Sequence, residues 1–123
     1  MAEGSQLHIE TTAGVTLVSF VTNNVLDVVQ IQKIGEELCR MVDEPDRKKL
    51  VLDFSNVRML SSQAIGMLLS VRKKSQAAKG EVVLSGLRPD LHKVFRITQI
   101  DKFFKFYDEA KQAVAAFGGQ PQA

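Results

Sequence analysis

Two adjacent serines, Ser61 and Ser62, have the residue types and placement best suited to chemistry in this sequence. They stand directly before a run with helical periodicity, where a serine hydroxyl can cap the helix by accepting a hydrogen bond from a free backbone N–H. The same position suits a phosphate, because free amides and the positive end of the helix dipole stabilise its charge. A cap needs only one hydroxyl. The residues alone therefore leave a cap and a phosphorylation site equally open.

Asp53 is a second candidate, because it follows a short apolar run in which a buried strand is predicted. Ligands of parallel α/β domains gather beyond the carboxyl ends of the strands, so an aspartate there could accept a phosphoryl group, as in a response-regulator receiver. That reaction needs further acids to hold magnesium, and the first predicted strand supplies only Glu10. We interpret Asp53 as a strand-end carboxylate that hydrogen-bonds the following loop.

The patterns of other enzymes and metal sites are missing from the sequence. The serine pair lacks the flanking glycines of a hydrolase elbow, and Gly66 stands alone rather than in a phosphate-binding loop. His8 and His92 fall in different predicted elements, and Cys39 is the single cysteine, so neither a Cys/His metal cluster nor an internal disulfide is expected. We expect no enzymatic activity, metal or cofactor.

Hydrophobic periodicity predicts the elements that must position these residues. Strands are expected at 7–10, 15–21, 50–54, 82–84 and 103–107, and helices at 27–43, 61–79, 89–95 and 108–117, with Asp108 capping the last. Asn23-Asn24 is expected to end the second strand, and 55–60 to be a connecting loop. The order β-β-α-β-α-β-α-β-α implies an antiparallel hairpin followed by parallel crossovers. The fold class is α/β: one domain over 1–123 (core about 7–117) with a mixed, mostly parallel five-stranded sheet and four helices.

Length and composition agree with one globular domain of 123 residues, 45% hydrophobic and 24% charged. No apolar stretch reaches the roughly 20 residues of a membrane span, and the polar start is not a signal peptide, so we expect a cytoplasmic protein. Residues 1–44 carry seven acids and two bases (−5), and residues 45–123 carry fourteen bases and seven acids (+7). We interpret these cations as solvated helix faces and expect no direct contact with nucleic acid.

The run from Leu50 to Leu69 resembles the central motif of STAS domains, the fold of bacterial anti-sigma factor antagonists. That motif is an apolar strand, an Asp or Asn, a short loop, Asp-Ser-Ser-Gly-Leu-Gly and an apolar helix. Leu26-Asp27, Gly80, Pro89 and Phe95 fall in register with other landmarks of the family. The resemblance spans roughly Leu7 to Phe117.

The resemblance implies a binding module. In the family, the unphosphorylated antagonist docks on an anti-sigma factor that is also a serine kinase, and docking frees the sigma factor. The kinase, to which ATP and magnesium belong, then phosphorylates the antagonist and breaks the complex, and a serine phosphatase resets it. Some relatives are instead non-switching scaffold subunits of signalling or transporter complexes. The oligomeric state is not predicted.

Aligned with the motif, Ser62 takes the place of the phosphoacceptor, and a reading one position earlier makes it Ser61. This sequence departs from the pattern: Ser61 replaces the aspartate, Gln63 the second serine and Ala64 the first glycine. The predicted partner-binding surface consists of Asp27, Asn56, Arg58, Met59, Leu60, Ser61, Ser62 and Gln63. Met59 and Leu60 are consecutive loop hydrophobes that need either the core or a partner to cover them.

Overall fold

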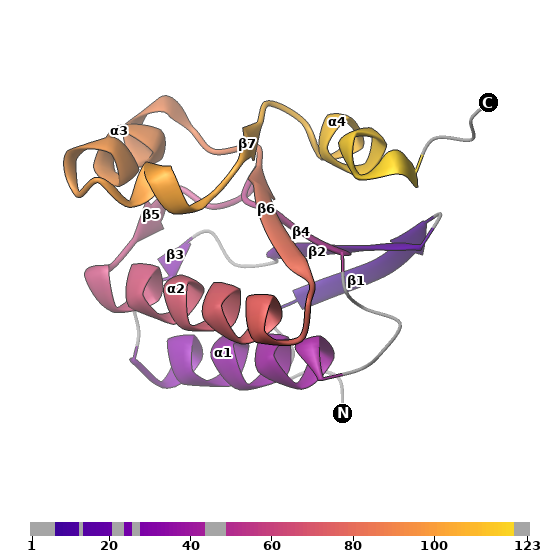
Figure 1. Cartoon of the computed structure of the whole chain (residues 1–123). Coiled ribbons are helices and arrows are strands. Elements are labelled where there is room, and N and C mark those ends of the chain that lie inside the picture. The colour runs from indigo at the N-terminus through magenta and orange to yellow at the C-terminus, as the bar shows by residue number, and fades with distance from the viewer. Residues whose placement is uncertain (1–6, 13, 21–23, 26–27, 44–48, 120–123) are drawn as a thin grey trace.

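The computed structural model describes residues 7–12, 14–20, 24–25, 28–43 and 49–119. Within these residues, a mixed sheet has helices on both faces (Figure 1). The strands are β1 (Leu7–Thr12), β2 (Val15–Phe20), β3 (Asn24–Val25), β4 (Lys49–Asp53), β5 (Met59–Leu60), β6 (Glu81–Ser85) and β7 (Phe106–Tyr107). The helices are α1 (Val28–Val42), α2 (Ser62–Ala77), α3 (Pro89–Ile97) and α4 (Ala110–Val114), with a 3₁₀ turn η2 (Ile100–Phe103) and a π-helical turn η3 (Ala115–Gly119).

The main sheet has five strands in the order β1-β2-β4-β6-β7. The hairpin pair β1 and β2 is antiparallel, and the other three pairs are parallel. Strand β4 lies at the centre, and its Leu50, Val51 and Leu52 are fully buried, as expected of a strand covered on both faces. The predicted fold class is therefore confirmed.

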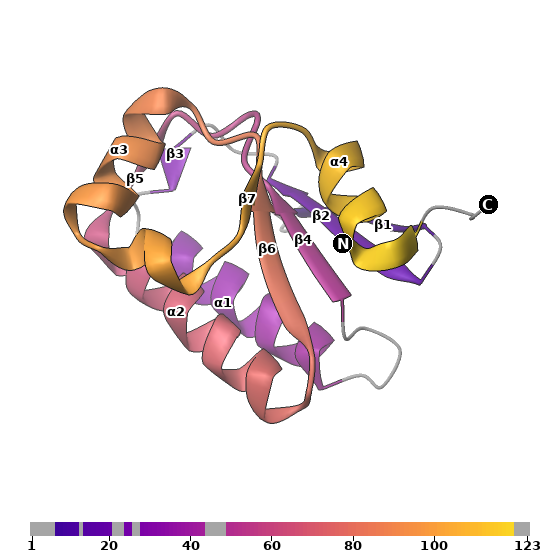
Figure 2. The same ribbon diagram turned by 45° about the horizontal axis from the view of Figure 1, so that its top comes forward.

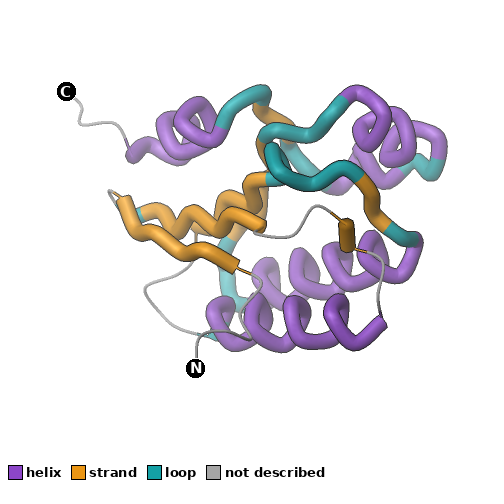
Figure 3. Tube along the Cα trace, turned by 180° about the vertical axis from the view of Figure 1, so that it is seen from behind, coloured by secondary structure: helices purple, strands orange, loops and turns teal. Residues whose placement is uncertain are grey.

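Two hydrophobic cores hold the layers together. The larger core joins one face of the sheet to α1, α2 and α3, and the predicted apolar stripe of α1, including Ile34 and Leu38, is buried in it. The smaller core, around Val51, Val83 and Ala113, lies on the opposite face beneath α4. Figure 2 shows α1 and α2 side by side across the sheet from α4, and Figure 3 shows the same layers from behind.

The carboxyl ends of the parallel strands meet at one edge of the sheet. Ser19 of β2, Asp53 of β4 and Ser85 of β6 are in register there. The loop after β4 and the start of α2 follow at this edge, so the sheet itself places the serine pair. None of the helices in the described ranges combines the length and hydropathy of a membrane span.

Three local predictions were wrong. The predicted strand 103–107 is reduced to β7, because residues 100–103 coil into η2 and the Phe104 ring turns inward to pack edge-on against Phe95, with ring centroids 6.4 Å apart. The last helix is capped by Glu109 rather than Asp108, and the backbone N–H of Glu109 donates to Gln112 Oε1 at 3.1 Å. The α-helix ends at Val114, and the chain continues as the π-helical turn η3.

The third correction concerns residues 55–60, predicted as a connecting loop, because Met59–Leu60 form a short strand. Asn24–Val25 and Met59–Leu60 form a separate two-stranded parallel ladder, β3 with β5, beside the first turn of α2 (Figure 1). Strands of two residues are too short to leave a periodic pattern in the sequence.

Candidate functional site

The two serines have different environments at the start of α2. Ser61 is the N-cap with extended backbone (φ −87°, ψ 164°), and its partly buried Oγ accepts a hydrogen bond from the Ala64 backbone N–H at 3.1 Å. Its carbonyl accepts from Ile65 N at 3.2 Å and so begins the helical hydrogen bonds. The hydroxyl of Ser61 is therefore occupied by the fold.

Ser62 is the first residue of α2 and is exposed to solvent. Within the described part of the chain its hydroxyl makes no hydrogen bond. The first amides of a helix have no partner inside the helix, so a group attached to Ser62 Oγ would lie at the positive end of the α2 dipole. Gln63, which follows it, is also exposed. The structure thus separates a capping serine from a serine open to a modifying enzyme.

Asp53 anchors the loop that leads to the serine pair. Its carboxylate accepts hydrogen bonds from Ser55 N at 3.2 Å and Ser55 Oγ at 3.0 Å, and from Ser85 Oγ of the neighbouring strand at 3.4 Å. The interpretation of Asp53 as a strand-end carboxylate bound to its own loop is confirmed. The Asp-x-Ser spacing is typical of such an aspartate turn, and it is the sequence signal that could have identified Ser55 as the donor to Asp53.

Gly86 supports the same loop from the next strand, and sequence reasoning missed it. Its φ of +71° is strained for any other residue, and a Cβ built there would meet Asp53 Oδ1 at 2.7 Å and Ser55 N at 2.9 Å. Its backbone N–H also donates to Tyr107 O at 3.0 Å. A glycine is required here because the chain that leaves β6 passes too close to the Asp53 turn to carry a side chain.

The rest of the loop presents some predicted site residues and buries others. Asn56 Nδ2 donates to Phe20 O at 3.3 Å, which ties the loop to the end of β2. Val57 is fully buried, whereas Arg58 is exposed and Met59 is 53% exposed. Leu60 packs against the larger core. Of the two loop hydrophobes, one thus belongs to the core and the other is available to a partner.

The β3–β5 ladder brings Asn24–Val25, which precede α1 in the chain, close to the serine turn. Val25 pairs with Leu60, two residues before the first residue of α2. Asp27, predicted both to cap α1 and to bind a partner, lies outside the described residues. The structure therefore gathers Asn56, Arg58, Met59, Leu60 and the serine pair at one edge, together with Asn24–Val25 of β3.

Each of the two histidines contacts another side chain of the fold. His8 Nε2 lies 3.1 Å from Glu10 Oε2 on exposed β1, and the His92 ring stacks on Phe106 with centroids 4.6 Å apart. Across the described residues, no three or more His, Cys, Asp or Glu side chains cluster in a way that could hold a metal ion.

The sequence of this chain matches that of a known protein family over most of its length. A sequence model of the STAS domain matches residues 6–113, which include all elements from β1 to most of α4. The chain belongs to the STAS domain family. The resemblance that rests on the serine motif is thereby confirmed over nearly the whole chain.

This STAS domain has relatives whose names state a role. It is 30% identical over 93 residues to BtrV of Bordetella bronchiseptica, a candidate anti-sigma factor antagonist, and the match covers 76% of this chain and 79% of BtrV. An anti-sigma-factor antagonist (STAS) domain protein from Planctomyces limnophilus has the same fold, with a TM-score of 0.82, 22% identity, and 93% and 99% of the two chains covered.

The fold is also that of SpoIIAA, an anti-sigma factor antagonist known in two forms. The unphosphorylated form matches this STAS domain with a TM-score of 0.70 and 17% identity, over 93% of this chain and 99% of that one. The phosphorylated Bacillus form matches with a TM-score of 0.71 and 13% identity, over 90% and 98% of the chains. At these identities the likeness concerns the fold.

Proposed function

We propose that this STAS domain is an anti-sigma factor antagonist: it binds an anti-sigma factor that is also a serine kinase and thereby releases a sigma factor. Phosphorylation of Ser62 by that kinase ends the interaction, and a serine phosphatase restores it. ATP and magnesium belong to the kinase, and this chain acts as a binding module without a cofactor of its own. The name of its relative BtrV supports the role.

The observation that carries the choice of Ser62 is the contrast between the two serine hydroxyls. A kinase must bring the acceptor oxygen into line with the transferred phosphoryl group, which requires an exposed hydroxyl. Ser62 is exposed, whereas the Oγ of Ser61 is held at 3.1 Å by the Ala64 N–H and is partly buried. Before it could attack a phosphoryl group, the Ser61 hydroxyl would have to leave its contact with the Ala64 N–H, whereas the Ser62 hydroxyl has no described contact to break.

The surroundings of Ser62 suit close docking of another protein. Gly66 lies one turn further along the same face of α2, and beyond the backbone of that helix no described atom lies within 4 Å of the Cβ that it lacks. A glycine inside a helix costs about 0.5–1 kcal/mol relative to alanine, and packing among the described residues does not require this one. The bare helix surface allows a partner backbone to approach Ser62, with exposed Met59 beside it as an apolar contact.

The switch follows from electrostatics at that contact. A phosphate on Ser62 adds about −1.5 to −2 charges in the middle of the docking surface. An unmatched buried charge costs about 3–5 kcal/mol, and about 1.4 kcal/mol corresponds to a tenfold change in affinity, so a micromolar complex would dissociate. The switch needs no rearrangement of the fold, and both the unphosphorylated and the phosphorylated form of SpoIIAA share the fold of this chain, with TM-scores of 0.70 and 0.71.

The proposal is tested by incubating the protein with each anti-sigma factor kinase of its source organism and Mg-ATP, followed by tandem mass spectrometry. We expect a single phosphate on Ser62, which is lost in Ser62→Ala and retained in Ser61→Ala. Phosphate on Ser61 instead would move the switch by one residue. A protein that binds these kinases and is phosphorylated by none would be a non-switching scaffold, the alternative that the resemblance leaves open.

A further inference from the structure

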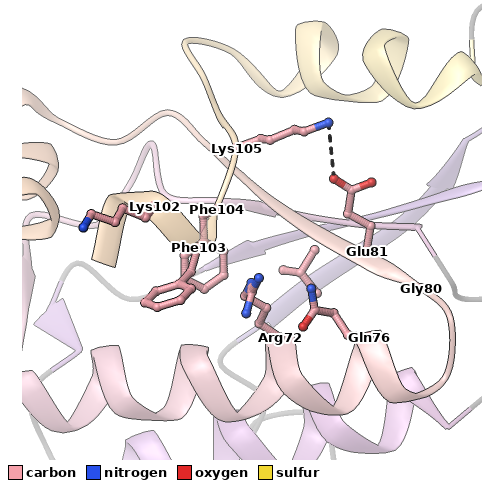
Figure 4. Close-up of a pocket in the computed structure, with 9 residues that line it drawn as sticks. Arg72, Gln76, Gly80, Glu81, Lys102, Phe103, Phe104 and Lys105 are labelled. Carbon is pink, nitrogen blue, oxygen red and sulfur yellow. Dashed lines mark ion pairs between the residues drawn. The ribbon is translucent and has the colours of Figure 1, made fainter. Parts of the chain in front are cut away.

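A hollow of about 420 Å³ opens between α2, η2 and the beginning of β6, away from the serine pair. Its wall includes Arg72 and Gln76 from α2, Glu81 from β6, and the segment Lys102–Lys105 (Figure 4). This size is typical of sites that hold a small molecule or a few residues of a peptide. Neither the family motif nor the proposed switch uses these residues.

The charge of the hollow is positive. Arg72, Lys102 and Lys105 line it against a single acid, Glu81, which pairs with Lys105 at 3.7 Å. In the described part of the chain, Arg72 has no carboxylate partner, and the Nζ of Lys102 donates only to the neutral Gln99 Oε1 at 3.3 Å. Two cations are therefore available to negative groups from outside.

An exposed aromatic ring lies among these cations. Phe103 is 47% exposed, and the Arg72 guanidinium carbon lies over its ring, 5.1 Å from the centroid, in a cation–π contact (Figure 4). Deeper in the hollow, the side chains of Phe104 and Val82 are almost fully buried and add apolar surface. Arginine beside an aromatic ring is the composition that protein interfaces favour.

The hollow is far enough from Ser62 to be used at the same time. Arg72 lies ten positions after Ser62 in α2, which is about 15 Å along a helix. Glu81 begins β6, whereas the serine loop follows the opposite, carboxyl ends of the strands. A ligand in the hollow would thus leave the start of α2 uncovered.

We propose that this hollow binds an acidic segment of a second protein partner, with its carboxylates on Arg72 and Lys102 and a neighbouring apolar side chain against Phe103. The mixture of cations and apolar wall fits a peptide that carries both kinds of group. A domain that binds nucleic acid typically has a pI above about 9. This chain has a pI of about 8.8 and a net charge of +2. A flat bilayer would not reach Phe104 or Val82.

The test uses two labelled peptides of equal length, one of alternating Glu and Phe and one of Glu alone, with fluorescence anisotropy at low and high salt. We expect the Glu-Phe peptide to bind more tightly and to weaken as salt rises. Since an exposed ion pair is worth up to about 1 kcal/mol and charge reversal adds repulsion, Arg72→Glu combined with Lys102→Glu should weaken binding roughly tenfold or more. Phe103→Ser should remove the preference for the Glu-Phe peptide.

The matched control is Lys93→Glu combined with Arg96→Glu, which reverses two exposed cations on α3 outside the hollow. It should leave peptide binding within about twofold, as should Ser62→Asp, so the result does not depend on the serine switch. Equal losses in the α3 double variant and in the hollow double variant would overturn the proposal. Tighter binding of a single-stranded oligonucleotide or phosphatidylserine vesicles, or self-association abolished by the hollow variants, would overturn it as well.

Discussion

At the scale of single residues, the position of a hydroxyl relative to a helix end decides what it can do. Ser61 and Ser62 are adjacent and chemically identical, but Ser61 Oγ satisfies the Ala64 N–H, while Ser62 Oγ faces solvent. The first contributes to folding and the second is open to chemistry. Their roles can therefore be separated by measuring stability and phosphorylation in the same variants.

Ser61→Ala should lower the free energy of unfolding by about 1 kcal/mol, because the helix loses its side-chain cap. Ser62→Ala should leave it almost unchanged, because no described contact is lost. Urea denaturation of the two variants checks this difference. Equal stabilities for both variants would show that the cap does not hold α2.

A second residue-scale prediction concerns Gly86. Gly86→Ala should destabilise the protein by at least about 1–2 kcal/mol, because alanine is strained at positive φ and its Cβ would collide with the Asp53 turn. Thermal denaturation measures the loss. Gly14→Ala is the matched control, since Gly14 also has positive φ, but no described atom outside its chain neighbours lies within 4 Å of its missing Cβ. A loss no larger than that of Gly14→Ala would exclude the collision.

At the scale of elements, α2 combines a buried face with a surface that is left bare at Gly66. Gly66→Ala should raise the free energy of unfolding by about 0.5–1 kcal/mol, because alanine is the better helix former and meets no obstacle. Gly35→Ala on α1 should gain less or lose stability, since its Cβ would lie 2.9 Å from Met67 Cγ. Denaturation curves for the two variants test the comparison.

The same Gly66 substitution should weaken docking of the kinase, because the added methyl lies one turn from Ser62. A variant that is more stable and yet phosphorylated more slowly would separate the two effects. Unchanged phosphorylation in the stabilised variant would show that the partner does not contact this turn.

Elements with long hydrophobic patterns could be predicted from the sequence, and elements created by tertiary contacts could not. The stripe of α1 and the apolar run of β4 are apparent because many buried residues share one period. The strands β3 and β5 have only two residues each, which is too few to show a period. The run Phe103–Tyr107 has the residue types of a strand, but its Phe104 is buried against Phe95 instead. In each case a local preference gave way to packing.

The candidate site was predictable to a similar extent. The serine pair and the role of Asp53 follow from motif and position. The support from Gly86 could not be derived, because it depends on how closely β6 approaches the Asp53 turn. The hollow at Arg72 and Phe103 likewise joins elements that are about thirty residues apart in the chain.

At the scale of the whole molecule, two cores of unequal size share one sheet. The larger core joins α1, α2 and α3 to the sheet, whereas α4 rests on the smaller cluster around Ala113. Native-state hydrogen exchange should therefore show β4 and β6 amides opening only with global unfolding, and α4 amides opening at lower free energy. Equal protection in α4 and β4 would mean that the domain unfolds as one unit.

The central claim is that charge at Ser62, rather than charge anywhere near the start of α2, releases the partner. The most direct measurement is the affinity of the anti-sigma factor kinase for three forms, unmodified, Ser61→Asp and Ser62→Asp, by isothermal titration calorimetry. Aspartate is a good N-cap, so Ser61→Asp should bind much as the unmodified protein does. Ser62→Asp should bind at least about tenfold more weakly. Tight binding by Ser62→Asp together with loss of binding in Ser61→Asp would contradict the account.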